Sequence, residues 1–130
     1  MIVVDASALV VALVDDDADG DRARTRILDD PDLHAPHLVD LEVISVLRRV
    51  RHAGEIDERR VDEALGDLLE LALVRHPHWP LAARIWELRA NLTPYDASYV
   101  ALAEGLGCTL ITGDRRIARV AGVRCEVETL

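Results

Sequence analysis

The sequence contains no lysine and no phenylalanine, and aromatic residues make up only 3% of it. All 15 basic residues are therefore arginines. Without lysine, the protein cannot use a P-loop lysine, a Schiff base or a lysine that holds a transferred phosphoryl group. Without phenylalanine, alanine, valine, leucine and isoleucine must fill the core, which favours helices packed closely on a sheet.

Basic residues are also outnumbered by acidic ones. The net charge is therefore -9, and the isoelectric point is about 4.9. This balance argues against a passive nucleic-acid-binding protein, which holds phosphates with surplus basic side chains. An acidic pocket filled by cations could still accept RNA or DNA beside an arginine patch. Two clusters could supply such an arginine patch: Arg48, Arg49 and Arg51, and Arg115, Arg116 and Arg119. Each cluster would also suit a solvated helix face.

The few cysteines and histidines carry no metal-binding pattern. Cys108 and Cys125 lie in short apolar runs and are expected to be buried thiols in a reducing cytoplasm. The five histidines show no ligand spacing with the cysteines, which argues against a zinc site. The first apolar run, from Ile2, is too short for a signal peptide or a membrane span. We therefore expect a cytoplasmic protein without membrane association.

At 130 residues the chain predicts one domain, residues 1–130, with no repeat or linker. Short apolar runs alternate with segments of helical periodicity, which favours an α/β sandwich around a mainly parallel sheet. The predicted strands are Ile2–Asp5, Leu33–Pro36, Leu73–Arg75, Cys108–Thr112 and Val123–Val127. The predicted helices are residues 6–14, a second through Leu28, Leu38–His52, Glu58–Leu73, Leu81–Ala90, a helix from Pro94 that ends near Gly105 or Gly107, and Arg115–Val120.

Two of the predicted strands deliver an aspartate at or just after their C-terminal ends. Asp5 ends the first, and Asp114 follows the strand that ends at Thr112. Ligand and metal sites in open α/β sheets gather at this edge, so parallel neighbours would bring Asp5 and Asp114 to one crevice. Either residue could instead cap the helix that follows it. Asp96 has a similar alternative, a capping box with Thr93.

Glu42 is harder to explain as a cap. It lies within the Leu38–His52 helix on the same stripe as Leu38, Val39 and Val46. An unpaired ionised carboxylate buried there would cost several kcal/mol. Arg49 could neutralise it, but a metal ion accounts for it better. Asp40 is the other acid nearby, and its position relative to the valines points it elsewhere.

The four acids together predict a cation site. Carboxylates packed together repel one another unless cations neutralise them, and Mg²⁺ or Mn²⁺ prefers oxygen ligands of this kind. Such ions lower the pKa of a bound water and stabilise a leaving oxygen. Ser7 and Thr112 stand two residues from Asp5 and Asp114, placed to hydrogen-bond a ligand carboxylate or a bound water. Local backbone hydrogen bonding is an equally good account of these two hydroxyls.

Four stretches of the sequence resemble the PIN-domain family, and specifically its VapC-type toxins. They are IVVDASALVVALV, PHLVDLEVISVLRR, TPYDASYVALAEGLG and LITGDRRIA, and they run from one end of the chain to the other in the family's order. The segments YDASYVALAE and TGDRR are the most specific of these. An N-terminal Asp-x-Ser by itself would be a weak signal.

The resemblance implies a single nuclease domain with a five-stranded parallel sheet in an α/β/α sandwich. It further implies a Mg²⁺- or Mn²⁺-dependent endoribonuclease that dimerises and is silenced by a cognate VapB-type antitoxin. The substrate would be structured RNA, tRNA or ribosomal RNA, but the choice between them is not carried over because related toxins cut different ones. The family's acidic positions fall on Asp5, Glu42, Asp96 and Asp114, with Thr112 and Ser7 assisting. Arg115 and Arg116 are candidates for holding RNA phosphates.

Two other classes of function compete with a nuclease. A receiver-like phosphoacceptor or an aspartyl-phosphate phosphatase also gathers acids at strand ends, but both normally use a lysine, which this chain lacks. A non-catalytic, dimeric binding module would use the acids only as helix caps and the two-sided Leu38–His52 helix as an interface. Caps do not explain Glu42.

Overall fold

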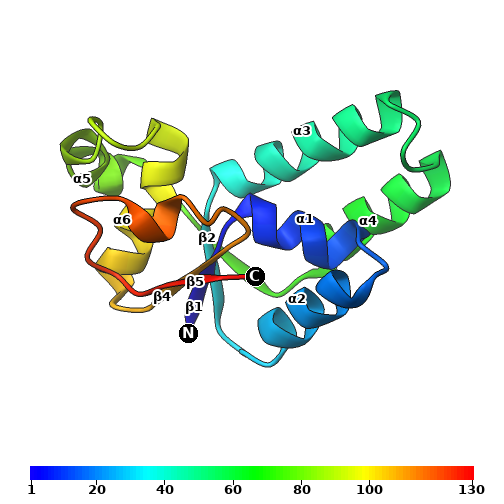
Figure 1. Ribbon diagram of the computed structural model, residues 1–130, viewed down its shortest axis with the longest axis horizontal. Helices are drawn as coiled ribbons and strands as arrows, with labels where there is room; N and C mark the ends of the chain where they lie inside the picture. The colour runs from blue at the N-terminus through cyan, green and yellow to red at the C-terminus, as the bar shows by residue number, and fades with distance from the viewer.

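A computed structural model describes residues 1–130 and contains one parallel sheet of five strands in the order β3-β2-β1-β4-β5. Helices α1 to α4 cover one side of this sheet, and α5 and α6 cover the other (Figure 1). The predicted three-layer α/β/α architecture is thereby confirmed. The strands are β1 (Ile2–Val4), β2 (Leu33–Pro36), β3 (Leu73–His76), β4 (Thr109–Thr112) and β5 (Val127–Thr129).

The helices follow the predicted order, with three differences in length. The predicted Glu58–Leu73 helix ends at Glu70. The predicted Leu81–Ala90 helix consists of a 3₁₀ turn at Trp79–Leu81 and a short α5, and the predicted Arg115–Val120 helix is a single 3₁₀ turn at Ile117–Arg119. None of the helices combines the length and the apolar character needed to cross a bilayer. The helices are α1 (Ala6–Val14), α2 (Ala18–Leu28), α3 (Leu38–His52), α4 (Glu58–Glu70), α5 (Ala82–Glu87) and α6 (Pro94–Leu106).

The last strand was predicted wrongly at Val123–Val127 and lies instead at Val127–Thr129. Its start is set by pairing with β4, in which Val127 lies opposite Leu110. The chain before it turns at Gly122, whose φ is +91°, and the backbone N–H of Arg124 donates to Glu104 instead of to the sheet. A local hydrophobic pattern contains neither of these long-range contacts.

The core is built from aliphatic side chains on both faces of the sheet. Val3, Val4, Leu110 and Ile111 of the central strands are completely buried, as expected of a parallel sheet covered on both faces. Helix α6 is buried along seven consecutive residues, Ala97–Ala103, because it crosses the sheet next to β1, β2 and β4. This burial holds the middle of α6 against the sheet.

Helix α3 is apolar on two sides, but only one of them is buried. Val39, Val43 and Leu47 face the core. Leu41 is 69% exposed and Ile44 is 42% exposed. The helix therefore packs against the domain along a single stripe and leaves a second apolar stripe at the surface.

Candidate active site

Asp5 lies at the C-terminal end of β1 and begins helix α1. Its side chain caps α1 by accepting a hydrogen bond from the backbone N–H of Ala8 at 2.9 Å. The same carboxylate accepts hydrogen bonds from Ser7 Oγ at 2.6 Å and from Thr112 Oγ1. Only 6% of the residue is exposed. The Asp5 carboxylate that caps α1 is also the one predicted to bind a cation. The helix-cap and metal-ligand interpretations of Asp5 therefore do not exclude each other.

Strand β4 reaches Asp5 through Thr112, because β1 and β4 are parallel neighbours in which Val4 lies opposite Ile111. Thr112 is fully buried, and its hydroxyl also accepts a hydrogen bond from the backbone N–H of Asp114. Gly113 follows, and its N–H donates to Ser7 Oγ at 2.8 Å. A Cβ at Gly113 would lie 3.1 Å from that same oxygen. A side chain at this position would therefore require Ser7 to shift by a few tenths of an ångström.

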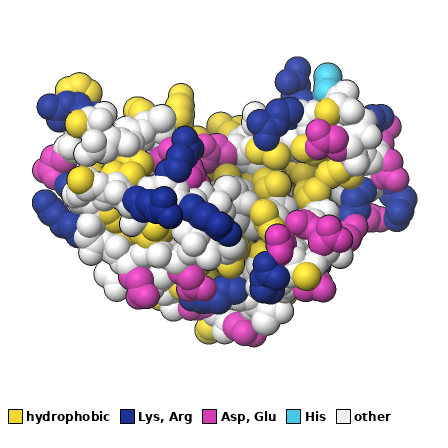
Figure 2. Space-filling model, viewed as in Figure 1, with side chains coloured by type: hydrophobic (Ala, Val, Ile, Leu, Met, Phe, Trp, Pro, Cys, Tyr) yellow, Lys and Arg dark blue, Asp and Glu magenta, His cyan; other side chains and the backbone are white.

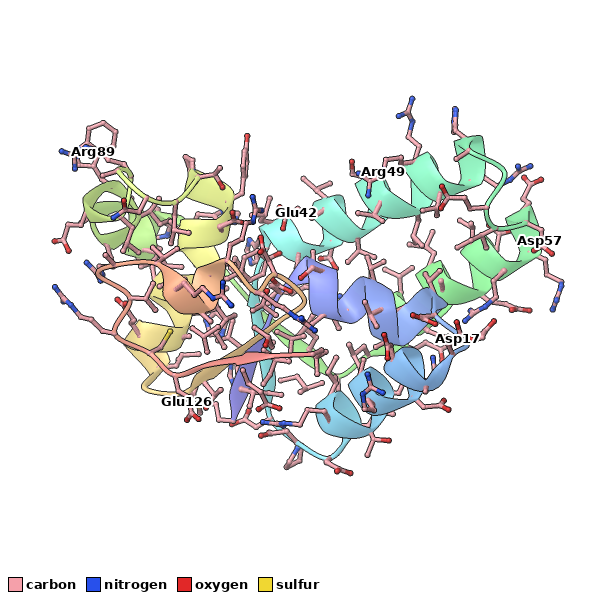
Figure 3. All side chains as sticks on the ribbon, viewed as in Figure 1. Asp17, Glu42, Arg49, Asp57, Arg89 and Glu126 are labelled. Atoms are coloured by element: carbon pink, nitrogen blue, oxygen red, sulfur yellow. The ribbon has the colours of Figure 1, made fainter.

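Glu42 lies on α3, half-buried, and its carboxylate is held by α6. Tyr99 Oη donates a 2.6 Å hydrogen bond to Glu42 Oε2. Arg49 is exposed farther along α3 and forms no ion pair with Glu42 (Figure 3). Asp40 does point elsewhere, as the sequence indicated, because it pairs with Arg75 at 2.7 Å. A phenol can orient Glu42, but it brings no positive charge to neutralise it.

Asp96 lies in the first turn of α6 and is half-exposed. Thr93 caps this helix by accepting a hydrogen bond from the Asp96 backbone N–H at 3.2 Å, and Pro94 occupies the first helical position. The Asp96 carboxylate itself accepts no hydrogen bond and forms no ion pair, so the reciprocal half of a capping box is absent. This acid is the least engaged of the four.

Asp114 differs from the other three acids because an arginine neutralises it. Arg116 donates to both of its carboxylate oxygens, with the shortest distance, 2.6 Å, from Nη2. This pair holds the pKa of Asp114 below its ordinary value. The Arg116 side chain is 85% exposed, and Arg115 is exposed as well. Asp114 thus lies at the rim of the site, whereas Thr112 makes the direct contact with Asp5.

The other three carboxylates form no ion pair, although the negative charge of Asp96 also acts on the Arg116 guanidinium. Burial raises the pKa of Asp5, and the charge of Asp96 raises it further, while the hydrogen bonds from Ser7, Thr112 and Ala8 oppose the rise. Burial also raises the pKa of Glu42; the Tyr99 hydrogen bond opposes this rise, whereas Asp96 and Asp5 add to it. Asp5, Glu42 and Asp96 therefore act on one another as neighbouring negative charges.

The donor set suits a hard divalent cation, although its members are not gathered around a single point. The side chains offer only oxygen donors, as Mg²⁺ and Mn²⁺ prefer. No three histidine, cysteine, aspartate or glutamate side chains lie close enough to hold one ion together. Asp5 is engaged by two hydroxyls, Glu42 by Tyr99 and Asp114 by Arg116. A cation would therefore have to draw these carboxylates towards it.

The acids lie where the two halves of the molecule meet. Figure 2 shows a hollow between the α5–α6 side and the α3 side, with acidic and basic side chains gathered at its edge. Glu42, at the beginning of α3, lies at this junction (Figure 3).

Sequence reasoning missed Tyr99 as a member of this site. The signal was the single aromatic residue within the buried run Ala97–Ala103. Its phenol reaches Glu42 across 57 positions of sequence, which periodicity along one helix cannot reveal.

Comparison with known proteins gives consistent matches over nearly the whole chain. The family model described as PIN domain matches residues 2–123. The curated protein Ribonuclease VapC9 of Mycobacterium tuberculosis is 46% identical over 127 residues, covering 98% of this chain and 96% of that protein. Ribonuclease VapC1 of the same organism is 44% identical and covers 97% and 95%.

Among solved structures, the fold is similar to that of Mycobacterium tuberculosis VapC20, described as a Sarcin-Ricin loop cleaving toxin. The TM-score is 0.71 at 19% identity, covering 95% of this chain and 97% of that one. At this identity the likeness supports the fold alone.

Proposed function

Since this chain belongs to the PIN-domain family and, within it, to the VapC ribonucleases, we propose that it is the toxin of a type II toxin–antitoxin pair. In this proposal it is a Mg²⁺- or Mn²⁺-dependent endoribonuclease that cuts structured RNA, either tRNA or ribosomal RNA. The observation that carries the proposal is the group of buried or half-buried carboxylates, Asp5, Glu42 and Asp96, which has no basic partner.

Each residue has a distinct role in the proposed mechanism. Ser7 and Thr112 hold the Asp5 carboxylate in one orientation, and Tyr99 does the same for Glu42. Asp96 offers a carboxylate that accepts no hydrogen bond and forms no ion pair. These three acids would hold the cation, with Asp114 joining them if it leaves Arg116. When bound, the cation supplies a water of lowered pKa and stabilises the leaving oxygen of an in-line displacement.

Arg116 is the basic group best placed to meet the substrate. Its guanidinium lies beside Asp114 at the rim of the site and is almost fully exposed. A planar guanidinium can bind a phosphate through two parallel hydrogen bonds. We assign Arg116, assisted by Arg115, to the RNA phosphates near the cut.

The receiver-like alternative fits less well. The lack of lysine removes the group that normally stabilises the phosphoryl oxygens in such proteins.

The proposed partners are the RNA substrate, a second copy of the chain and a cognate VapB-type antitoxin, all in the cytoplasm. The structure of VapBC2 from Rickettsia felis bound to a DNA fragment from their promoter is similar in fold to this chain. Its TM-score is 0.66 at 14% identity, covering 100% of this chain and 99% of that one. It supports an antitoxin partner by analogy of fold.

Cleavage of RNA by the purified, antitoxin-free protein tests the proposal. We expect cutting of total tRNA or ribosomal RNA with Mg²⁺ or Mn²⁺, and a loss of more than about a hundredfold in Asp5→Asn because a cation ligand is removed. Chelation by EDTA should abolish cutting, and added Mn²⁺ should restore it. Cutting that persists in Asp5→Asn or in the metal-stripped protein would contradict the mechanism.

A further inference from the structure

A cavity of about 200 Å³ lies beside the acids, where α3 and α6 both begin. It is separate from the carboxylates, and its walls are mostly apolar. The lining residues are Leu38, His78, Ile85, Pro94, Tyr95 and Ser98.

The cavity lies next to the Glu42–Tyr99 contact, between the first turns of α3 and α6. Leu38 and Glu42 are four residues apart on α3, and Tyr95 and Tyr99 are four apart on α6, so each pair occupies one helix face. Glu42 and Tyr99 meet through their 2.6 Å hydrogen bond, whereas Leu38 and Tyr95 line the cavity. A substrate positioned at Glu42 and Asp96 therefore has this cavity one helical turn away.

The two tyrosines of α6 are used in opposite ways. Tyr99 is 2% exposed, with its hydroxyl on Glu42, whereas Tyr95 is 60% exposed. The Tyr95 hydroxyl makes no hydrogen bond, so neither packing nor a polar contact accounts for the position of its ring. Trp79 and Trp86 are also exposed, at 80% and 67%, but Tyr95 is the one of these three aromatic residues that lines the cavity, so its ring is the aromatic face available to a ligand there.

The chemistry of the cavity selects the kind of ligand. His78 Nε2 accepts a hydrogen bond from the backbone N–H of Leu38 at 3.1 Å, so the neutral ring carries its proton on Nδ1 and can donate it. The neighbouring acids disfavour an anion in the cavity. An uncharged, planar and partly polar group fits these walls, and a nucleobase has that character.

We propose that this cavity binds one unpaired base of the RNA, next to the phosphate that is cut, with Tyr95 stacking on the base. The proposal rests on the ribonuclease function proposed above and deepens it. It identifies the substrate as RNA whose bases are free to leave a stack, because a base in a helix cannot enter a side pocket.

Binding of a fluorescent oligoribonucleotide tests this assignment without any cleavage. In an Asp5→Asn background with Mg²⁺, an unstructured oligonucleotide that carries 2-aminopurine should bind with quenching of its fluorescence as the base stacks. Tyr95→Phe should keep both the affinity and the quenching. Tyr95→Leu should bind about five- to a hundredfold more weakly, because one stacking contact is lost. Trp86→Leu is the matched control, since Trp86 is 67% exposed on α5 but does not line the cavity.

The outcomes separate this proposal from the ribonuclease proposal. If the wild type cuts RNA and Tyr95→Leu has the same KM and the same binding, the base pocket is wrong and the nuclease stands. If the wild type cuts no RNA with either metal, the nuclease proposal fails. A change in molar mass by light scattering in Tyr95→Leu, with RNA binding unaltered, would make this face a contact between copies of the chain and would also overturn the pocket.

Discussion

The two ends of helix α6 each carry a carboxylate, and the protein treats them in opposite ways. At the first turn, Asp96 lies near Asp5 and Glu42 without a basic partner. In the last turn, Glu104 accepts hydrogen bonds from Arg84 at 2.7 and 3.1 Å and from the backbone N–H of Arg124 at 2.8 Å. Arg84 also binds Glu87 and the carbonyl oxygen of Gly122. One end is neutralised within the chain and the other is not.

The pKa directions express the same contrast. Burial raises the pKa of Asp5 and of Glu42. Burial also acts to raise the pKa of Glu104, but the hydrogen bonds from Arg84 and Arg124 outweigh it, and the pKa lies below its ordinary value of 4.5. A buried acid with an arginine is thus a structural element, whereas buried acids without one call for a cation from solution.

Removing the charge at the neutralised end should have the largest effect on stability. Glu104→Gln leaves the guanidinium of Arg84, only 19% exposed, without its main partner. We expect a loss of about 3 kcal/mol in the free energy of unfolding, measured by urea denaturation. The response to Mg²⁺ should not change, because Glu104 lies far from the acids along α6. A reduced response would mean that the two ends are coupled.

The same pair gives a pH dependence with a definite sign. Because the folded pKa of Glu104 is lowered, its contribution to stability is present above about pH 4.5 and is lost as the pH falls through the folded pKa. Asp5 and Glu42 have raised pKa values, so their contribution is present at low pH and is lost as the pH rises through the folded values. Melting curves at several pH values, with Glu104→Gln as the control, separate the two trends.

Filling the uncompensated end with a cation should have a slightly smaller effect. Mg²⁺ at a hundred times its dissociation constant should stabilise the folded state by about 2.7 kcal/mol, since only the folded chain assembles the acids. Glu42→Gln should show a smaller rise in melting temperature, while Leu41→Gln, an exposed neighbour, should respond as the wild type does. Equal shifts in Glu42→Gln and the wild type would remove Glu42 from the site.

Removing the hydroxyl of Tyr99 should change the unfolding free energy less than either Glu104→Gln or Mg²⁺ binding does. Tyr99→Phe keeps the ring in the core but removes the hydrogen bond that Tyr99 donates to Glu42. This loss should cost about 1 kcal/mol in unfolding free energy. It should also weaken Mg²⁺ binding, measured by titration calorimetry, because Glu42 loses its orientation. Tyr95→Phe should leave both quantities unchanged. An unaltered Mg²⁺ affinity in Tyr99→Phe would show that Glu42 needs no such support.

Several features of the fold follow from short stretches of sequence. Thr93 and Pro94 predicted where α6 begins, and Gly107, at φ +67°, ends it as expected of a helix C-terminus. The alternation of apolar strands and periodic helices predicted the parallel sheet. Each signal lies within a few residues of the structure it specifies, so sequence reading could recover it.

Tertiary structure alone decided how the acids are used. The sequence predicted that Asp5 and Asp114 lie at one sheet edge. In the fold, Asp5 is hydrogen-bonded to Thr112, Asp114 to Arg116 and Glu42 to Tyr99. The contacts of Asp5 and Glu42 join residues 107 and 57 positions apart. Local periodicity records which face a side chain occupies but not which distant side chain meets it. The sequence by itself therefore determined that this protein carries acids at the ends of parallel strands and has no lysine that could neutralise them. Only the packing of α3 and α6 against the sheet decided which of those acids stay without a partner.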